Sequence, residues 1–449
     1  MRMRSLCLAL SCLLLLAACS GDDADSATSL TAATSAPTLD ANLSTPIPTT
    51  AVTVTPAADS VPEALTLALW WPDTLNPSDR TEVNDIINTQ INGFVEAEED
   101  ETQVDFRLKR YGGEQGAIMP TLRTASGVAP GALPDLTLIR RSDLVAAVDA
   151  GLVYPLDGIV SASTIAALYG PALRMGQVGD TLYGLPYLVD IQHIVYSAAV
   201  LEEAELTTIS TAFDDVIEAG IPLLMPTRRP NSINLTFYAQ YLAASGLQPE
   251  QDQSLTLDAD ALTDVLTFYE ALYRAGLLDE AALDYTSIND YAAIITSGGA
   301  FGSALVSSNL YLSEISAENG LAAASIATAD GQPTGVMSGW VWVMTTGNTE
   351  RQVLVGRFLN WMMEAGRQAE FAGVIRMLPS QPRALRDFPD ERVPVTAYDA
   401  MLNGAIIAPP EPFATTVART LQTAFMNVIT GEESAEQAVE WVMGQLRDD

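Results

Sequence analysis

Two kinds of apolar pattern alternate along the chain after about residue 62. Ala64–Trp71 alternates between apolar and polar positions and ends in two tryptophans, which predicts a strand. A helix is predicted from about Asp79, because large apolar side chains then recur at helical spacing: Val83, Ile87, Ile91 and Phe94. Gln103–Tyr111 and Ala117–Ser126 repeat this order of strand and helix. The pattern predicts an α/β fold in which helices flank a sheet.

The stretch Thr181–Ser197 breaks this pattern. It is an apolar run of the kind that forms a strand buried on both faces, but Asp190, Gln192 and His193 interrupt it. Polar side chains in a buried strand need hydrogen-bond partners or a place beside an open cleft. We therefore expect this strand to pass a cleft in which water or a ligand contacts it.

The second half of the chain contains further helices and one more tryptophan-rich strand. Helical spacing predicts the helices Ala212–Gly220, Ile233–Ser245, Thr263–Gly276 and Arg351–Ala365, whose aromatic side chains are expected in the core. Pro333–Thr346 predicts a strand in which Trp340 and Trp342 lie two residues apart and share a face. That face lies either on a ligand site or under the following helix.

The first residues predict export and lipidation. Met1–Ala18 combines basic residues, a short apolar run and small residues before Cys19, which is typical of a cleaved signal peptide. Leu-Ala-Ala-Cys (residues 16–19) matches the lipobox of bacterial lipoproteins, so we predict that Cys19 carries lipid. An ordinary signal peptide with a chance cysteine is the alternative. Cys7 and Cys12 leave with the signal, so the mature protein has no disulfide.

The next segment, Ser20–Val61, is rich in Thr, Ser, Ala, Pro and Asp and has almost no large apolar residues. Such a segment cannot bury enough surface to offset the entropy of an ordered chain, and we predict a flexible tether over residues 19–62. Roughly 390 residues remain, which is more than one ordinary domain and indicates two lobes.

Charge and histidine content exclude several classes of function. The chain has 22 basic and 56 acidic residues, a net charge of −34, and this charge repels phosphate backbones, so no nucleic acid partner is expected. His193 is the only histidine, which removes most zinc sites and most catalytic triads. No phosphate-binding loop, nucleophile elbow or calcium-binding loop is present, and no cofactor is predicted.

Several segments in the same order resemble one family. Gly179–Leu206, with Tyr-Gly-Leu-Pro-Tyr and Val-Tyr-Ser, is similar to the central segment of the family 1 extracellular solute-binding proteins of the maltodextrin type. Pro134–Leu138 followed by Leu144–Asp157, then Arg351–Ala365 and Met377–Pro379, resemble later family segments. Ile294–Ser308 also resembles the family but lacks its usual tryptophan, which indicates a smaller or more polar ligand.

This resemblance implies a fold and a role. The fold would be a two-lobe α/β fold of the periplasmic-binding-protein type (type II), with several chain crossings and a cleft between the lobes. One lobe would comprise residues 63–188 and 332–378, and the other residues 189–331 and 379–449. The role would be that of a monomeric, membrane-anchored, extracytoplasmic receptor. It would capture a small solute, most simply a sugar, by hinge closure and deliver it to an ABC permease.

We predict ligand contacts along the proposed cleft. Three candidates follow the first strand, because ligands in α/β folds bind at the carboxyl ends of strands. Ala129–Leu138 predicts a turn and then a third strand, and arginines follow it. They suit a sugar hydroxyl or a carboxylate, although either of them could instead pair with Asp143. Trp71 could equally be a core residue. The full set of predicted ligand contacts is Trp71, Asp73, Asn76, Arg140, Arg141, Tyr187, Asp190, Gln192, Asn309, Trp340 and Phe413.

Two alternatives to a transport receptor remain open at this point. A cell-surface glycan hydrolase would need a pair of carboxylates across the cleft, for which Asp73 and Asp190 are the candidates. A surface receptor without transport would use the same fold and bind its ligand without a permease. We predict that the chain is not an enzyme, because no feature of the sequence marks a nucleophile.

Overall fold

The computed structural model describes residues 64–98, 102–113, 116–206, 209, 211–247, 257–297, 299–314, 320–409 and 415–446. These residues belong to one compact unit. The predicted signal peptide, Cys19, the tether and Phe413 lie outside the described residues and stay predictions. Within these ranges no helix has both the length and the apolar character needed to cross a membrane.

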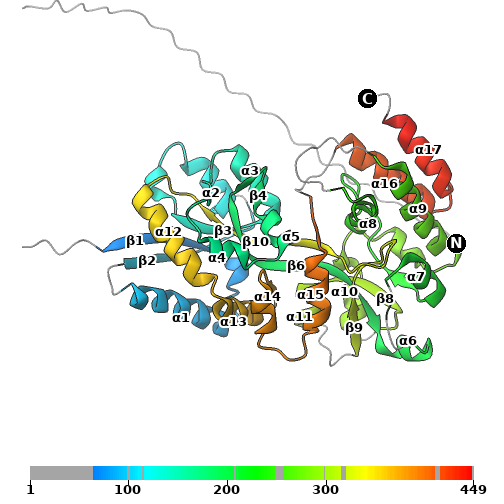
Figure 1. Ribbon diagram of the computed structural model, residues 1–449, viewed down its shortest axis with the longest axis horizontal. Coiled ribbons are helices and arrows are strands. Elements are labelled where there is room, and N and C mark those ends of the chain that lie inside the picture. Colours follow the sequence, from blue (N-terminus) through cyan, green and yellow to red (C-terminus); the bar gives the residue numbers. More distant parts are fainter. Residues whose placement is uncertain are drawn as a thin grey trace, which may run out of the picture. The chain divides into compact units, whose positions relative to one another are not determined.

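Most strands join in one mixed sheet, with the order β2-β1-β3-β10-β6-β8-β7 along its main path (Figure 1). β1, β2 and β3 are parallel to one another, whereas β10 is antiparallel to both β3 and β6. β9 and β11 pair with β6, β12 pairs with β10, and β4 and β5 form a separate pair. The strands are β1 (Leu65–Pro72), β2 (Thr102–Lys109), β3 (Leu136–Arg140), β4 (Gln177–Val178), β5 (Thr181–Leu182), β6 (Gly184–Ser197), β7 (Leu223–Leu224), β8 (Ser303–Ser307), β9 (Leu321–Ala324), β10 (Val336–Met344), β11 (Leu378–Pro379) and β12 (Ile406–Ile407).

Helices flank this sheet, as the alternating pattern predicts. The α-helices are α1 (Thr81–Ala97), α2 (Ile118–Ala125), α3 (Arg141–Asp149), α4 (Ala162–Ala166), α5 (Gly170–Met175), α6 (Ala198–Glu203), α7 (Phe213–Ala219), α8 (Leu235–Ser245), α9 (Ala259–Arg274), α10 (Ala292–Thr296), α11 (Ser308–Glu314), α12 (Thr349–Met362), α13 (Ala365–Ile375), α14 (Pro382–Arg386), α15 (Val395–Asn403), α16 (Thr416–Ile429) and α17 (Ala435–Gln445). The 3₁₀ helices are η1 (Asp73–Leu75), η2 (Pro130–Ala132), η3 (Glu280–Leu283) and η4 (Ile288–Asp290).

Strand β6 joins two hydrophobic cores. It is 14 residues long, and most of its side chains are buried, which confirms the predicted buried strand. Its first part pairs with β10 and its last part with β8 and β9. Leu185 and Leu188 lie in the first core, whereas Ile194 and Tyr196 lie in the second. The chain therefore passes from one lobe to the other along this strand.

The first core surrounds β1, β3, β10 and the beginning of β6. The apolar face predicted for the first helix is confirmed, since Val83, Ile87, Ile91 and Phe94 are all buried in α1. Phe94 packs edge-on against Phe358 of α12, with ring centroids 5.1 Å apart. Figure 1 shows α1, α12 and α13 beside this part of the sheet.

The second core lies among α8, α9, α16 and α17, which Figure 1 shows grouped together. Phe425 of α16 contacts Phe237 of α8 and Tyr269 of α9, at centroid distances of 5.0 and 4.8 Å. The prediction that these helical aromatics are core residues is confirmed for most of them. Tyr273, near the end of α9, is instead 44% exposed.

The segments after β10 divide between the two cores. Residues from Leu378 to Ile407, including Tyr398 of α15, pack in the first core, whereas residues from Ala418 to Val442 pack in the second. The predicted lobe bounds assign all of residues 379–449 to the second lobe. These lobe bounds stay a prediction, because membership of a hydrophobic core does not by itself define where a lobe begins or ends.

Candidate functional site

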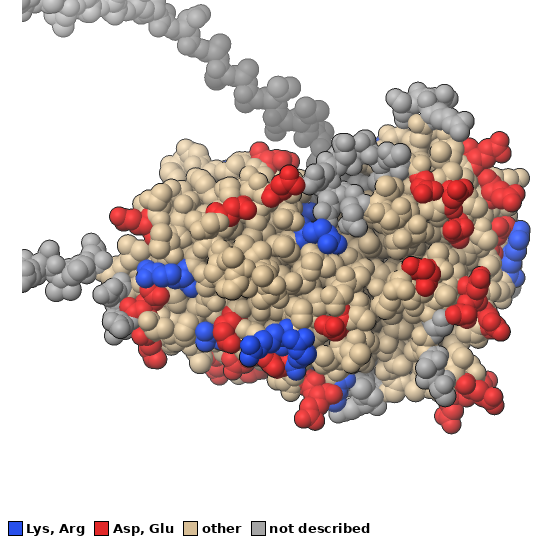
Figure 2. Space-filling model, in the orientation of Figure 1, with Lys and Arg blue, Asp and Glu red and all other residues tan. Residues whose placement is uncertain are grey.

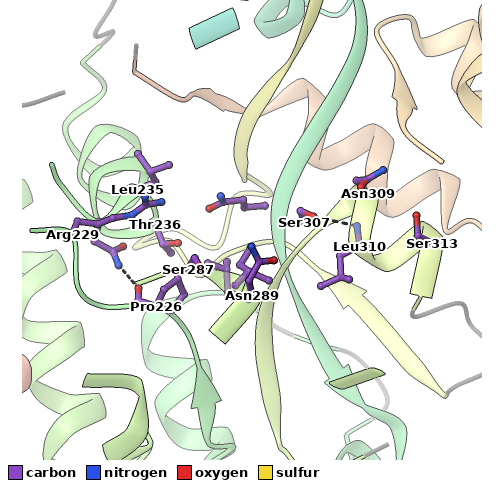
Figure 3. Close-up of a pocket in the computed structure, with 14 residues that line it drawn as sticks. Pro226, Arg229, Leu235, Thr236, Ser287, Asn289, Ser307, Asn309, Leu310 and Ser313 are labelled. Atoms are coloured by element: carbon purple, nitrogen blue, oxygen red, sulfur yellow. Dashed lines mark hydrogen bonds between the residues drawn. The ribbon is translucent and has the colours of Figure 1, made fainter. Parts of the chain in front are cut away.

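A polar cleft lies beside β6, with lining residues from the elements of both cores. It consists of two adjoining cavities of about 600 and 470 Å³ that share Gln192, Arg229, Leu235, Asn309 and Ser313. This size is typical of small-molecule sites, which range over about 300–1,000 Å³. In the close-up of the smaller cavity, Arg229 and Leu235 lie on one side of the central strands and Asn309 and Ser313 on the other (Figure 3).

Asp190 of β6 lines the larger cavity and is held by the first turn of α11. Its Oδ1 accepts hydrogen bonds from Ser308 Oγ at 2.8 Å and from Asn309 N at 3.0 Å. Burial raises the pKa of the Asp190 carboxyl, and these hydrogen bonds oppose the shift. Gln192, two residues further along, lines both cavities, and its side chain makes no hydrogen bond within the described part of the chain. Asp190 thus has protein partners, whereas the Gln192 amide is available to a ligand.

Tyr111, which follows β2, connects three parts of the wall formed by the first lobe. Its backbone N donates to Asp73 Oδ1 at 3.0 Å, and its hydroxyl donates to the Asp143 carboxylate. The same hydroxyl accepts from the backbone N of Arg140 at 2.7 Å. Burial, followed by the negative charge of Asp143, raises the pKa of Tyr111 well above its usual value. Tyr111 therefore stays a neutral donor and positions the loop after β1 and the start of α3.

Arg140 and Trp340 stand beside Tyr111 on the larger cavity. The Trp340 ring meets the Tyr111 ring edge-on, with centroids 4.6 Å apart. The Arg140 guanidinium lies 5.2 Å from the Tyr111 ring centroid and 5.4 Å from that of Trp340. Cation–π contacts of this kind hold a guanidinium in place without neutralising its charge. The wall thus presents a positioned positive charge next to an aromatic edge.

Among the residues that the structure describes, no three His, Cys, Asp or Glu side chains gather as metal ligands would. His193 is fully buried, its Nε2 lies 3.1 Å from the Tyr398 hydroxyl, and burial lowers its pKa to about 4. His193 is therefore a neutral interior residue rather than part of the cleft.

The sequence matches the family described as bacterial extracellular solute-binding protein over residues 94–401, well over half of the chain. The chain belongs to the bacterial extracellular solute-binding proteins. No curated protein matches the sequence. The family resemblance derived from the central segment is therefore confirmed.

The fold of this solute-binding protein is similar to that of solved relatives. The cyclic α-maltosyl-1,6-maltose binding protein from Arthrobacter globiformis is 16% identical, with a TM-score of 0.65 over 84% of this chain and 97% of that chain. The maltose-binding periplasmic protein from Listeria monocytogenes, in complex with maltose, is 13% identical, with a TM-score of 0.63 over 86% and 97%. A family 1 extracellular solute-binding protein from Bifidobacterium longum subsp. infantis is 13% identical, with a TM-score of 0.63 over 86% and 99%. These similarities confirm the predicted two-lobe α/β fold.

The structure brings most of the predicted contacts of this solute-binding protein to one place. The residues that line the larger cavity are Arg140, Arg141, Asp190, Gln192, Asn309 and Trp340. Trp342, which was predicted to share a face with Trp340, is fully buried and contacts Phe358 of α12. Trp340 thus lines the cavity, whereas Trp342 lies in the core under α12. Whether the lining residues bind a solute stays a prediction.

Two predicted contacts, Trp71 and Tyr187, lie in the core and not on the cleft, which corrects their expected placement. Both are fully buried, and both pack on Phe371 of α13, at 5.3 Å for Trp71 and 5.6 Å for Tyr187. For Trp71 the core alternative therefore holds. Tyr187 lies at a shift in the register of β6 and β10 and has no residue paired opposite it on β10.

Two further predicted contacts lie near the cleft without lining it. Asp73 is held by the backbone of Tyr111, and Asn76 is 7% exposed and donates to Asn84 Oδ1 at 3.3 Å. Polar side chains in turns commonly bind nearby groups in this way. Their neighbours Thr74 and Pro77 line the cavity instead. The hydrolase alternative requires Asp73 and Asp190 to face each other across the cavity, so this geometry does not support it.

Several lining residues have no clear signal in the sequence. Arg229 lies in an irregular loop before α8, and Arg80 lies just before α1, where it pairs with Glu82 at 3.0 Å. Ser338 could have been found as a polar residue in an apolar strand, and the structure places it directly opposite Asp190 in the β10–β6 pair. Tyr111 was also missed as a positioning residue, although the glycine turn after it marks the end of β2.

Proposed function

We propose that this chain is the extracytoplasmic solute receptor of an ABC importer and that its solute is a sugar or an oligosaccharide. The observation that carries this proposal is a polar cleft, lined from both lobes, in a chain of the solute-binding family. Two of the similar solved structures are named for maltose or a related saccharide, which supports a sugar as the class of solute.

Hinge closure explains how such a cleft captures its solute. Arg140 and Trp340 come from elements of the first core, whereas Leu235 begins a helix that packs on the second. A solute that touches both walls stabilises the closed arrangement of the lobes over the open one. The Gln192 amide of β6 and the Ser338 hydroxyl of the neighbouring strand β10 offer donors and acceptors that suit sugar hydroxyls.

The proposed cellular place is the outer side of a membrane, with lipid on Cys19 and the domain held on a tether. Two or more acyl chains give stable anchoring where one chain does not. Cys19→Ala is expected to move the protein from the membrane fraction to the soluble fraction and to abolish labelling with radioactive palmitate. Retention of the variant in the membrane with unchanged labelling would contradict the lipid anchor.

The first test of the solute class is thermal unfolding of the protein with a panel of monosaccharides, oligosaccharides, polyols and amino acids. A ligand at a hundred times its dissociation constant adds about 2.7 kcal/mol to the free energy of unfolding. In a protein of this size the midpoint is expected to rise by about one to a few degrees. Stabilisation by amino acids but by no saccharide would contradict the sugar assignment.

Delivery to a permease needs a separate test in cells. A strain that lacks this chain is expected to lose uptake of the solute that stabilises the purified protein, and the wild-type gene should restore it. Unchanged uptake, together with clear binding in vitro, would favour a surface receptor without transport. A monomer is expected in solution, which sedimentation analysis can check.

A further inference from the structure

The charge of the cleft is opposite to that of the protein around it. The whole chain has 22 basic and 56 acidic residues. Among the described residues that line the two cavities, the cationic side chains are Arg80, Arg140, Arg141 and Arg229, and the one carboxylate is that of Asp190. Acidic side chains are scattered over the face shown in Figure 2. A chance sample of this chain would place more carboxylates than arginines in the cleft.

The nearby carboxylates do not remove this positive character. Asp190 Oδ1 accepts from the first turn of α11 and forms no ion pair within the described part of the chain. Asp143, which was considered as a partner for the arginines, accepts the Tyr111 hydroxyl. Glu82 pairs with Arg80 from an exposed position, where it is screened by water. None of these three carboxylates pairs with Arg140, so the charge of that guanidinium remains available to a solute.

Arg140 is the best-defined cation of the cleft. Its guanidinium contacts the rings of Tyr111 and Trp340, and it pairs with no carboxylate among the residues that the structure describes. Arg140 is also the N-cap of α3, whose first residues Arg141 and Ser142 line the same cavity. The partial positive charge of a helix N-terminus thus adds to that of the guanidinium. A guanidinium fork binds carboxylate or phosphate oxygens in a bidentate manner.

The described part of the cleft lining offers little aromatic surface for a long neutral saccharide. Trp340 is the one aromatic side chain among the described residues that line the two cavities, and it is only 6% exposed. Stacking on aromatic faces is therefore a small part of the available binding energy. Charge-assisted hydrogen bonds, which are about twice as strong as neutral ones, are the larger part that the lining offers.

We propose that the solute is an acidic saccharide, one that carries a carboxylate or phosphate group, and that this group binds at Arg140 and the start of α3. This inference rests on the proposed function, since it names the class of sugar that the same cleft receives. Gln192 and Ser338 would then bind the hydroxyls of the ring. The arginine set selects the solute by charge, in a protein whose acidic surface otherwise repels anions.

Titration calorimetry of the purified full-length protein with matched ligands tests this proposal. One set is galacturonate, its methyl ester and galactose, in which the ring is kept while the charge is removed. A second set is glucuronate, glucose 6-phosphate and glucose, which separates carboxylate from phosphate. In each set we expect the charged member to bind at least about thirty-fold more tightly than its neutral counterpart, the factor for one charged hydrogen-bonded partner.

Arg140→Gln is the variant that addresses the site itself. It keeps a long polar side chain but loses the charge, so affinity for the acidic saccharide should fall at least about thirty-fold, and by a larger factor than affinity for the neutral counterpart. Arg107→Gln is the matched control, because Arg107 is exposed, pairs with Asp105 at 2.6 Å and lies outside the cleft lining. The control variant should bind both ligands as the wild type does.

Each outcome of these measurements decides between the two proposals. Binding of a neutral sugar that is as tight as binding of its acidic counterpart would overturn the charge inference and leave the sugar receptor standing. Equal loss of both ligands in Arg140→Gln would overturn the placement of the acid group. No binding of any saccharide, charged or neutral, would overturn the proposed sugar receptor and this inference with it.

Discussion

The two walls of the cleft are held in place by different chemistry. The wall of the first lobe depends on the Tyr111 phenol, which joins Asp73, Asp143 and the backbone of Arg140. The wall of the second lobe depends on amides. Asn234 caps α8 by accepting from Phe237 N at 2.9 Å and donates to Pro226 O at 2.6 Å. Gln422 of α16 accepts from Asn234 N at 2.6 Å and donates to Thr227 O at 2.9 Å.

This difference separates recognition from scaffolding. In the first wall a hydrogen bond of Tyr111 reaches the backbone of Arg140, which faces the cavity, so losing that bond acts on Arg140 directly. In the second wall the amides tie the loop before α8 to a distant helix, and Asn234 itself also lines the smaller cavity. We therefore expect damage to the first wall to change which solute binds. Damage to the second wall should lower affinity for all solutes alike.

The largest effect on binding is expected from Trp340→Ala. The substitution removes the aromatic edge of the first wall and one of the two rings that hold Arg140. Affinity should fall at least about thirty-fold, because Arg140 loses one of the two rings that hold its guanidinium beside the solute. Titration calorimetry with the solute found by thermal unfolding measures it. Normal binding by this variant would contradict the position assigned to the cleft.

Trp342→Ala is the control for this change, because Trp342 is two residues away and fully buried against Trp71. It should lower the free energy of unfolding by about 3–5 kcal/mol and leave affinity at low temperature nearly unchanged. Chemical unfolding gives the first quantity and calorimetry the second. An equal loss of affinity in both variants would show that Trp340 acts only through the core.

Asn234→Ala tests the second wall. It removes the cap of α8 and the bond to Pro226, so the free energy of unfolding should fall by about 2 kcal/mol. Affinity for neutral and acidic saccharides should fall by the same factor. Asn348→Ala is the matched control, since Asn348 caps α12 by accepting from Arg351 N at 3.0 Å and lies outside the cleft lining. A change of ligand preference in Asn234→Ala would break the distinction between the walls.

Tyr111→Phe tests the first wall with a smaller change. The ring and its contact with Trp340 remain, but Asp143 and the backbone of Arg140 lose a partner. We expect a loss of about 1–2 kcal/mol in the free energy of unfolding and a larger loss of affinity for acidic than for neutral ligands. Tyr169→Phe is the control, because its hydroxyl donates to Asp399 at 2.7 Å outside the cleft lining. Equal effects on both ligands would place the role of Tyr111 in stability alone.

The sequence predicts the fold well because the fold depends on repeated patterns. The helical spacing in α1 and the long apolar run of β6 each follow from the burial of one face or both faces. The order of these elements, read against a known family, then defines two lobes. The region from residue 379 to 407 is harder, because its apolar residues fit either core, and only packing in space shows that most of them join the first.

The site is predicted less completely, because side-chain direction depends on local events. Asp190 and Gln192 are identified because polar side chains in an apolar strand need hydrogen-bond partners or a place beside a cleft. Trp71 is misplaced because β1 is buried on both faces, so that Trp70 and Trp71 both lie in the core and neither lines the cleft. Arg229 is missed because its loop has no periodic pattern of apolar residues. Tyr111 is missed because its role depends on three partners from separate segments.

The smallest expected effect is on the pH dependence of stability, and it concerns Asp190, which lies on β6 between the two walls. Because burial raises the pKa of its carboxyl, ionisation is disfavoured in the folded protein. The stability that the protonated group contributes is complete below its ordinary pKa of 3.8 and is lost as the pH rises through the raised value. Asp190→Asn keeps an acceptor for Ser308 and Asn309 but cannot ionise. The variant should therefore be more stable than the wild type at pH 7, and the difference should shrink towards pH 4.

Chemical unfolding of both proteins between pH 4 and 8 measures this difference in stability directly. Comparing the two proteins also removes the contribution of the other group that titrates in this range. His193, three residues further along β6, also titrates in this window, because burial lowers its pKa from 6.5 to about 4, so stability falls as the pH falls between these values. Since both proteins contain His193, its contribution cancels in the difference between them. If the difference does not vary with pH, the Asp190 carboxyl ionises as easily in the cleft as in water. The cleft would then be open enough at β6 to solvate a charge, and the positive lining would act on a hydrated solute.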